Sequence, residues 1–351
     1  MTRITLPRTT WCPLAEAHQT RADALTRDHR ERTARGETHP VFDFLFTYYP
    51  YRPSALRRWH PGAGVALADA ADSPQATWKW YRTARGAPNR TDPGTTGRTS
   101  RSTANPTDAS AADRTAHTPA NGTVSLDTAA LVAARGRTFT FIRDLLQRTA
   151  SRAGNFGCFG LHEWAMVYRT PETRHEVPLR LGREATDAVV DSHPIACTHF
   201  DAFRFFTPEA VPLNRVQPTR ESQAALEQPA CLHAGMDLYK WVTKLGPAVP
   251  GELLLDAFEL ARDIRILDMR ASPYDVSAWG FTPVAIETDR GKDEYARQQR
   301  GFAGRADVLR QRTITAINAT LAEPPEPAPA SSARPGSAPE PRQPEPACIP
   351  R

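Results

Sequence analysis

Apolar residues recur every three or four positions in the segment GELLLDAFELARDIRILDMR, which begins at Gly251. This spacing places the apolar residues on one face of a helix. The turn-forming sequence ASPYD, which directly follows the segment, ends the helix. The pattern therefore predicts a long helix with one buried stripe. The stripe consists of Leu253, Ala257, Leu260, Ile264 and Leu267.

A second helix is predicted within residues 125–154, SLDTAALVAARGRTFTFIRDLLQRTASRAG. Ser125 or Asp127 can cap its first turn, because a short polar side chain accepts hydrogen bonds from free backbone amides. Gly154 is the residue expected to end it.

Shorter or less regular patterns predict the remaining elements. Residues 219–228, TRESQAALEQ, form a helix with Thr219 at the cap but without the acidic residue that completes a capping box. Residues 292–323 form the final helix. Residues 175–182, HEVPLRLG, and 282–288, TPVAIET, are expected to be short strands.

Two segments contain almost no large apolar side chains. Residues 83–123 and the proline-rich residues 323–351 cannot bury enough surface to offset the entropy of folding, so both are expected to be disordered. The remaining residues, 1–82 and 124–322, are expected to form one domain, because neither part alone provides a complete core. The fold class is predicted to be mainly α with a small β component, or α+β.

Composition indicates which partners and which cellular compartment to expect. The 351 residues are 40% hydrophobic, and the net charge of +5 is a weak indication of a nucleic-acid partner. The sequence has neither an apolar run of signal-peptide length nor one that could span a bilayer, so we expect a cytoplasmic protein without a membrane partner. Five widely spaced cysteines lack any CxxC pair and are expected to be reduced thiols.

Known catalytic motifs match poorly. HEWAM, from His162, begins like the HExxH zinc helix but has Met166 at the position of the second histidine. GNFGCFG has GxxGxxG spacing and follows a helix, which is not the dinucleotide-binding pattern. No cofactor is therefore predicted. If a metal binds, its ligands are expected to be His162, His199 and His233.

The stretch THFDAFRFF, residues 198–206, has two interpretations. In the first, its phenylalanines form core and Asp201 pairs with Arg204. In the second, Asp201, or Glu163 of the HEWAM segment, is a carboxylate held beside aromatic rings, where burial alters its pKa. The two interpretations are compatible if the phenylalanines anchor the segment while His199 and Asp201 face a polar pocket.

The sequence YYPYRPSALRRWHPG also has two interpretations. Arg52, Arg57 and Arg58 stand among tyrosines and a tryptophan, which is the mixture found on surfaces that hold phosphates and stack bases. A helical hairpin with its arginines in water and its aromatic residues packed inward accounts for the same pattern.

Five stretches together resemble an actinobacterial family labelled 3-methyladenine DNA glycosylase. They are HPVFDFLFTYYPYRPSALRRWHPG, GCFGLHEWAMVYR, CTHFDAFRFFTP, PTRESQAALEQPACLHAGMDLYKW and ELARDIRILDMRASPYD, and the resemblance covers nearly all of the chain outside residues 83–123 and 323–351. It implies hydrolysis of the N-glycosidic bond of an alkylated purine in duplex DNA.

On this resemblance, a carboxylate stabilises the cationic sugar and helps water to attack. The residues expected to act are Asp201 or Glu163, with His199 or His162 as partner. The alkylated base, flipped from the duplex, is expected to stack on aromatic walls and the DNA phosphates to bind arginines. The expected walls are Trp164, Tyr239 and Trp241, and the expected phosphate-binding residues are Arg52, Arg57 and Arg58.

Two other functions remain compatible with the same residues. One is a small-molecule enzyme, metal-dependent or not, in which His162, Glu163, His199, Asp201 and His233 share one pocket. The other is a non-catalytic protein that binds nucleic acid. All of these hypotheses require residues from distant parts of the sequence to converge.

Overall fold

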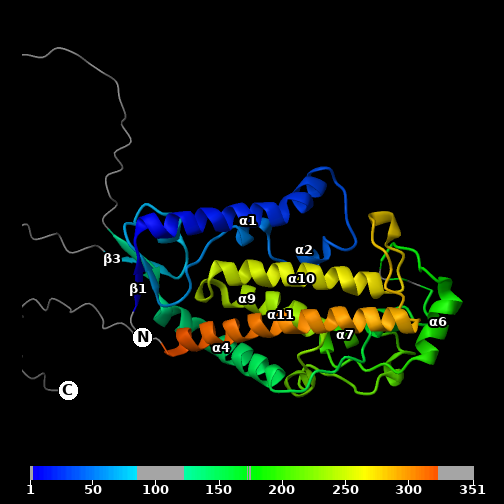
Figure 1. Ribbon diagram of the computed structural model, residues 1–351. Coiled ribbons are helices and arrows are strands. Elements are labelled where there is room, and N and C mark those ends of the chain that lie inside the picture. The colour runs from blue at the N-terminus through cyan, green and yellow to red at the C-terminus, as the bar shows by residue number, and fades with distance from the viewer. Residues whose placement is uncertain (1–2, 85–121, 172, 174, 323–351) are drawn as a thin grey trace, which may run out of the picture.

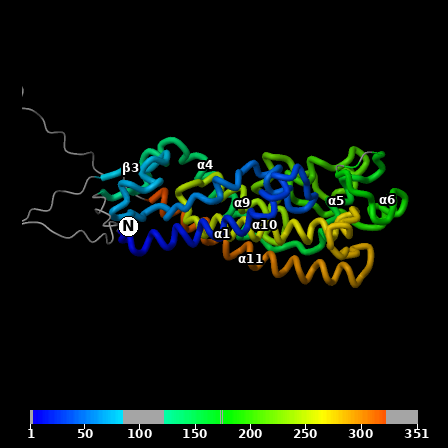
Figure 2. The backbone as a smooth tube through the Cα atoms, turned by 90° about the horizontal axis from the view of Figure 1, so that it is seen from above, coloured from blue at the N-terminus to red at the C-terminus, as the bar shows by residue number. Residues whose placement is uncertain are grey.

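The computed structural model describes residues 3–84, 122–171, 173 and 175–322. Long helices run side by side along the molecule, and a four-stranded sheet lies at one end (Figures 1 and 2). The predicted fold class, mainly α with a small β component, is therefore confirmed. The longer helices are α1 (Arg8–Ala34), α4 (Thr128–Ala150), α6 (Gly182–Ser192), α9 (Leu232–Leu245), α10 (Gly251–Ala271) and α11 (Asp289–Ala322).

Short helical segments connect the long helices and carry many of the polar residues of interest. The short α-helices are α2 (Phe44–Tyr48), α3 (Pro53–Leu56), α5 (Leu161–Ala165), α7 (Phe200–Phe203) and α8 (Gln223–Leu226). The 3-10 helices are η1 (Pro74–Thr77), η2 (Val211–Leu213), η3 (Gly246–Ala248) and η4 (Ser277–Trp279).

Helix α10 lies at the centre of the fold, and its predicted apolar stripe is confirmed because every residue of the stripe is buried. It packs against α9 and α11, and α11 also packs against α4 (Figure 1). The main core includes Leu45 and Leu56 from the first part of the chain and Leu245 and Ile317 from the last part. One core therefore joins the two parts that flank residues 85–121.

The N-terminal cap of α4 agrees with the sequence, but its C-terminal end does not. Asp127 precedes the helix, and its carboxylate accepts a hydrogen bond of 3.0 Å from the Ala130 amide. The helix ends at Ala150 with Ser151 at the C-cap, so the prediction that Gly154 ends it was wrong. The side chains of Ser151 and Arg152 donate to the Arg148 carbonyl at 2.9 and 3.0 Å, so this end of the helix needs no left-handed glycine.

The predictions for α8 and α11 had mixed outcomes. Helix α11 confirms the final helix and begins slightly earlier, at Asp289. Helix α8 is a single turn that starts after Ser222, and Thr219 caps only the preceding turn, where its hydroxyl accepts from the Ser222 amide at 3.1 Å. None of the described helices is both long and apolar enough to cross a membrane.

The sheet comes from segments that were not predicted as strands. Its order is β1-β2-β4-β3, with β1 parallel to β2 and the other neighbours antiparallel. Residues 175–182 and 282–288 form no strand, apart from a single bridge between Leu179 and Tyr274. Pro178 and Pro283 lack the amide hydrogen that a ladder needs, which explains the wrong prediction. The strands are β1 (Ile4–Leu6), β2 (Val65–Leu67), β3 (Tyr81–Ala84) and β4 (Thr123–Leu126).

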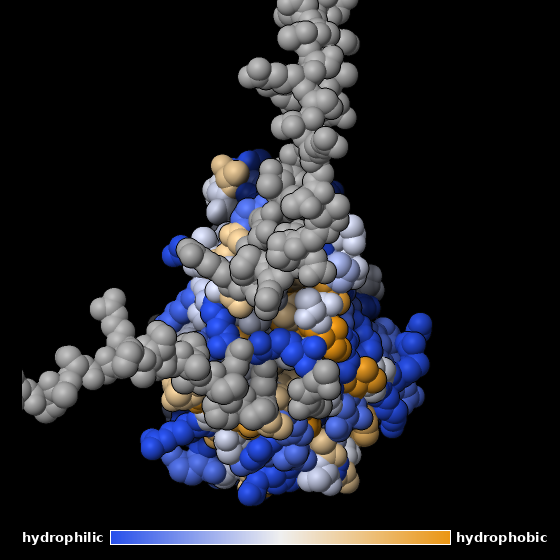
Figure 3. Space-filling view, turned by 90° about the vertical axis from the view of Figure 1, so that its left-hand side faces the viewer, coloured by the Kyte–Doolittle hydropathy of each residue, from blue (hydrophilic) through white to orange (hydrophobic). Residues whose placement is uncertain are grey.

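Strands β3 and β4 set the boundaries of the predicted insertion. Ala84 pairs with Thr123 and Tyr81 with Leu126, so both ends of residues 83–123 belong to the sheet. The rest of that prediction, and the prediction for residues 323–351, lie outside the described residues. The end of the molecule that contains the sheet carries scattered apolar residues among hydrophilic ones (Figure 3).

Replacement of Gly291 by alanine is expected to destabilise the protein by about 3 kcal/mol, because the new Cβ overlaps fixed backbone. That atom would lie 1.8 Å from the carbonyl oxygen and 2.3 Å from the carbonyl carbon of Ala285. On the same helix, a Cβ at Gly301 would meet no atom of the described residues within 4 Å apart from its chain neighbours and the adjacent backbone of the helix. Gly301→Ala is therefore the control and should stabilise α11 by about 0.5–1 kcal/mol. Urea denaturation measures both, and equal effects would contradict the clash.

Candidate functional site

Helices α5 and α10 bring a histidine, an arginine and two carboxylates together in the interior. The Nε2 atom of His162 lies 2.9 Å from one carboxylate oxygen of Asp268, and Arg265 donates to the other oxygen at 2.9 Å. The same Arg265 nitrogen donates to Glu163 at 3.2 Å. All of these side chains are buried. The group contains two acids and two bases, and Asp268 contacts both bases.

The protonation states of this group follow from burial and mutual attraction. Burial disfavours the charged form of His162, but the adjacent Asp268 outweighs it and raises the histidine pKa well above its usual value. Burial also opposes ionisation of Asp268, yet His162, His233 and Arg265 hold the pKa of Asp268 far below its usual range. Burial and the charge of Asp268 raise the pKa of Glu163. Glu163 is thus the acid of this group that retains its proton most readily.

Helix α9 contributes a second polar group from a single face. His233, Asp237 and Lys240 stand four and three residues apart, which places them on the same side of the helix. Lys240 donates to Asp237 at 2.5 Å and to Asp201 of α7 at 2.9 Å. The hydroxyl of Tyr49 donates to the other Asp237 oxygen at 2.8 Å. Lys240 therefore joins α9 to α7 through two carboxylates.

Histidine rings connect the two groups. The ring of His233 lies 4.4 Å from that of His162 and 5.4 Å from that of His199, centroid to centroid. His199 is 1% exposed, and its nitrogens lie 3.6 Å from Asp237 and 3.7 Å from Glu227. At these distances no hydrogen bond forms, and the buried Nδ1 of His199 has no partner among the described residues. The three histidine rings thus lie next to one another in the interior.

A small cavity of about 60 Å³ opens onto both groups. Glu163 and Arg265 reach it from the first group and Asp201 and His233 from the second, and aromatic rings also line it. His233 is the partly exposed histidine of the three. We call this space the acid–base cavity. Its principal lining residues are Phe44, Tyr48, Glu163, Asp201, Phe205 and His233.

The two carboxylates of the acid–base cavity have opposite tendencies to ionise. Burial opposes ionisation of Asp201, but Lys240, His199 and Arg204 outweigh it and lower its pKa. Glu163 has a raised pKa. One carboxyl group therefore stays ionised under conditions in which the other holds a proton, as in acid–base pairs of hydrolases.

The same residues include groups of metal-ligand type. Nitrogen and carboxylate atoms of His162, Glu163, His233 and Asp268 all lie within 4.8 Å of one another. However, both oxygens of Asp268 already have partners, His162 and Arg265. A divalent ion would have to displace the buried guanidinium or face its repulsion. A second group of this type consists of His199, Asp201 and Asp237. Lys240 donates to both of its carboxylates, as Arg265 donates to Asp268 in the first group.

The structure does not place the predicted base-stacking residues on the cavity wall. Trp164 and Tyr239 are fully buried and Trp241 is 4% exposed. The Trp164 indole donates to the Ala271 carbonyl at 2.9 Å, as expected of a core tryptophan. These large side chains pack between helices because burial stabilises them more than exposure does. Instead, Phe44, Tyr48 and Phe205 line the cavity, in the role predicted for the three buried residues.

The predicted phosphate-binding arginines lie elsewhere. Arg57 pairs with Asp23 of α1 at 2.9 Å, and Arg58 lies 5.8 Å from the ring centroid of Trp78. Both line a separate cavity, whereas Arg52 precedes α3 and lines neither cavity. They are not brought together with Asp201 or Glu163.

Sequence reasoning missed Arg265 and Asp268. They continue a buried row along α10 that begins with Phe258 and Ala261, at intervals of three and four residues. A charged pair spaced three residues apart within such a row is a signal for a buried ion pair, because an unpaired charge is rarely buried. The partner of His162, Asp268, therefore had to be sought in this row of α10 and not in the HEWAM segment.

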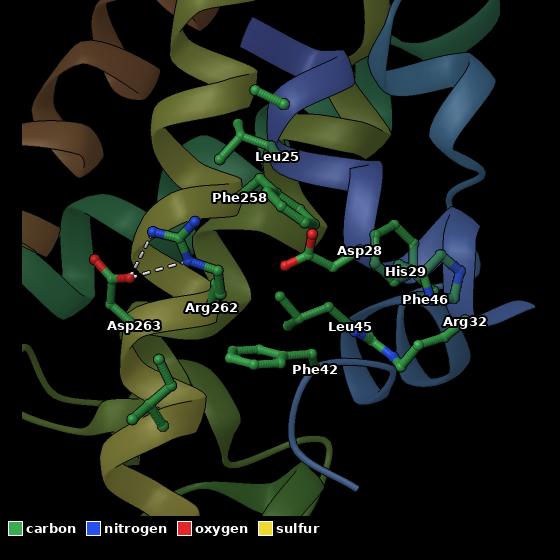
Figure 4. Close-up of a pocket in the computed structure, with 12 residues that line it drawn as sticks. Leu25, Asp28, His29, Arg32, Phe42, Leu45, Phe46, Phe258, Arg262 and Asp263 are labelled. Atoms are coloured by element: carbon green, nitrogen blue, oxygen red, sulfur yellow. Dashed lines mark hydrogen bonds and ion pairs between the residues drawn. The ribbon is translucent and has the colours of Figure 1, made fainter. Parts of the chain in front are cut away.

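Another cavity, of about 250 Å³, lies between α1, α2 and α10 and contains none of the predicted site residues (Figure 4). Phe42, Leu45 and Phe258 form its apolar surface. Asp43, just outside it, holds His29 at 2.8 Å and Arg32 at 2.7 Å. Arg262, the other arginine that lines this cavity, pairs with Asp263 at 3.0 Å, so its basic groups already have acidic partners.

The fold and the site define a mainly α protein with a buried acid–base network at the junction of α5, α7, α9 and α10. Comparisons with protein-family models, with curated proteins and with solved structures find no match to the chain.

Proposed function

We propose that the protein hydrolyses the N-glycosidic bond of an alkylated purine in duplex DNA, such as 3-methyladenine. The observation that carries this proposal is the pair of carboxyl groups with opposite pKa shifts, Glu163 and Asp201, on one aromatic-walled cavity. An ionised carboxylate that shares a cavity with a protonated one is the pair that most glycosidases use. The resemblance of the sequence to the glycosylase family supports the same activity.

In this mechanism, the bond between the sugar C1′ and the purine nitrogen breaks, and Asp201 stabilises the developing cation. Asp201 then accepts a proton from the water that attacks C1′. Glu163 donates a hydrogen bond or proton to the departing base. Lys240 keeps Asp201 ionised and in place at 2.9 Å.

The aromatic wall supplies the surface for the base. Phe44, Tyr48 and Phe205 line the cavity, and aromatic rings stack favourably on an electron-poor, alkylated purine. Guanidinium groups already lie over two of them, Arg265 at 4.1 Å from the Phe44 centroid and Arg204 at 4.3 Å from the Phe205 centroid, so a base would have to displace these groups. The cavity of about 60 Å³ is smaller than typical ligand sites of ~300 Å³ or more. Entry of a flipped base therefore requires these side chains to move apart. Among them, the partly exposed Phe205 packs against the exposed Arg204.

A metal-dependent small-molecule enzyme is the second candidate. The observation that favours it is the approach of four ligand-type residues, His162, Glu163, His233 and Asp268, within 4.8 Å. In this function, a bound ion would activate water, and the carboxylates would serve as ligands. The pairing of Asp268 with Arg265 favours the metal-free mechanism.

The wild-type protein is expected to release free base from methylated duplex DNA, and the release is expected to persist in EDTA. The measurement is chromatography of the released base, combined with metal analysis of protein purified without an affinity-tag metal. Release that EDTA abolishes and zinc or iron restores would transfer the chemistry to a metal centre. Tight binding of the duplex without release would instead identify a nucleic-acid-binding protein.

A further inference from the structure

A second cavity, of about 470 Å³, lies between α1, α3 and η1 and shares no lining residue with the acid–base cavity. Its volume is within the range of sites that bind small organic ligands. Arg8 and Trp11 reach it from α1, Arg57 and Arg58 from the end of α3, and Trp78 from the end of η1. We call it the Trp78 cavity.

The basic groups of the Trp78 cavity differ in how they are paired. Arg8 forms an ion pair of 2.7 Å with Asp72, and Arg57 forms one of 2.9 Å with Asp23. Arg58 is exposed and has no ion pair with a carboxylate in the part of the chain that the structure describes. Its guanidinium is therefore the group that an anion can neutralise.

An aromatic platform stands beside this arginine. The guanidinium carbon of Arg58 lies 5.8 Å from the ring centroid of Trp78. The Trp78 ring is supported by His60 at 5.0 Å and Tyr81 at 6.1 Å, both in edge-to-face geometry. The His60 ring is held in turn by the Tyr81 hydroxyl, 2.9 Å from its Nδ1. A flat ligand would thus meet a tryptophan whose orientation is already fixed, which lowers the entropy cost of binding.

Two buried polar atoms in the wall lack partners. The residues Ser73 and Gln75 line the cavity and are 5% and 4% exposed. The Ser73 hydroxyl and the Gln75 amide oxygen make no hydrogen bond within the described residues. Buried polar groups are normally satisfied, so these two positions call for a partner that can donate hydrogen bonds. The amide oxygen of Gln75 accepts only, and it therefore selects a donor such as a ring N–H or amino group.

We propose that the Trp78 cavity binds a nucleotide, with the phosphate on Arg58, the base against Trp78 and an amino or N–H group of the base donating to Gln75. A nucleotide combines the three properties that the wall selects, namely negative charge, a flat aromatic ring and hydrogen-bond donors. Arginine is well suited to phosphate because its fork of N–H groups matches two phosphate oxygens. The inference does not depend on base release at the acid–base cavity.

The nucleotide is either free or part of a nucleic-acid strand, since both carry the same phosphate and base. Titration calorimetry with adenosine 5′-monophosphate and with a short single-stranded oligodeoxyadenylate distinguishes these sources. Preferential binding of the first identifies a metabolite site, and preferential binding of the second identifies a contact with nucleic acid. Either result supports the proposal, provided that binding depends on Arg58.

Arg58→Ala is expected to weaken binding of the preferred ligand about tenfold, the loss of one charged hydrogen-bond pair. Arg52→Ala is the matched control, because Arg52 is equally exposed, lies nearby in the sequence and does not line the cavity. Neither exposed arginine is part of the core, so both variants should fold, which circular dichroism verifies. Inorganic phosphate and adenosine, each offering half of the ligand, should bind at least about tenfold more weakly than the monophosphate.

The proposal is overturned if neither nucleotide nor oligonucleotide binds saturably to the wild-type protein. It is also overturned if Arg58→Ala and Arg52→Ala bind equally well. Base release at the acid–base cavity is measured in a separate assay, so failure of one proposal leaves the other intact.

Discussion

Replacement of Asp268 by asparagine is expected to lower the free energy of unfolding by about 3–5 kcal/mol, the usual cost of breaking a buried ion pair from one side. Asp268 is fully buried and holds both His162 and Arg265 at 2.9 Å. Without its charge, Arg265 keeps only its contact with Glu163 at 3.2 Å, and Nε2 of His162 faces a neutral amide. Equilibrium urea denaturation gives the difference directly.

Asp263→Asn is the matched control on the same helix. Asp263 is partly exposed and pairs with Arg262 at 3.0 Å and Arg305 at 2.9 Å. Exposed ion pairs contribute less than about 1 kcal/mol, so the control should lose little. Equal losses in the two variants would show that burial does not determine the strength of these pairs.

The effect of Asp268 should also depend on pH. Its pKa in the folded protein is far below the ordinary value of 3.8, because His162, His233 and Arg265 outweigh the effect of burial. A lowered carboxyl pKa stabilises the folded state fully above the unfolded value, and the contribution decreases as the pH falls below it. The difference between wild type and Asp268→Asn is therefore expected to shrink in acid.

Asp201→Asn is expected to reduce base release about 10²- to 10⁴-fold, the usual contribution of a general acid or base. The loss should occur without unfolding, because Lys240 keeps its second partner, Asp237, at 2.5 Å. Glu163→Gln should reduce release less, since a neutral amide still donates a hydrogen bond to the departing base. Single-turnover release from methylated duplex DNA measures both.

The pH dependence of release separates the two roles. Asp201 must be ionised, and its lowered pKa places the acidic limb below the ordinary aspartate value of 3.8. Glu163 must be protonated, and its raised pKa places the alkaline limb above the ordinary glutamate value of 4.5. Glu163→Gln should remove the alkaline limb and leave the acidic one.

Asp144→Asn serves as the control for these variants. Asp144 is half-exposed, pairs with its neighbour Arg143 at 2.9 Å and lies on α4, outside the acid–base cavity. Its release rate should equal that of the wild type. Full activity in folded Asp201→Asn and Glu163→Gln would rule out the proposed mechanism.

Three of the longer helices, α4, α10 and α11, could be predicted from sequence because each carries its own periodic signal, whereas α1, α6 and α9 were not predicted. The stripe of α10 repeats over several turns, and Asp127 marks the start of α4 directly. The strands have three or four residues each, too short for alternation to be recognised. Their pairing joins segments far apart, such as Ile4 with Val65, which local patterns do not reveal.

The candidate site could be predicted in part. His162, His199 and His233 were expected as ligands if a metal binds, and their rings do lie together. Arg265 and Asp268 were hidden in an apolar row, where pattern analysis expects core. Which aromatic residues face the cavity depends on side-chain packing and could not be read from the sequence.

The pairing of Ala84 with Thr123 has a consequence for how this chain tolerates change in length. The polypeptide leaves and re-enters the sheet at neighbouring positions, so whatever lies between them does not have to bridge any distance. The entropy cost of closing such a loop grows only logarithmically, by about 0.6 kcal/mol for each doubling of its length. Insertions and deletions between these two residues are therefore expected to leave the strand register unchanged. This junction is the natural place for related chains to diverge in size, or for a foreign domain to be grafted, while the helices and the acid–base cavity stay unchanged.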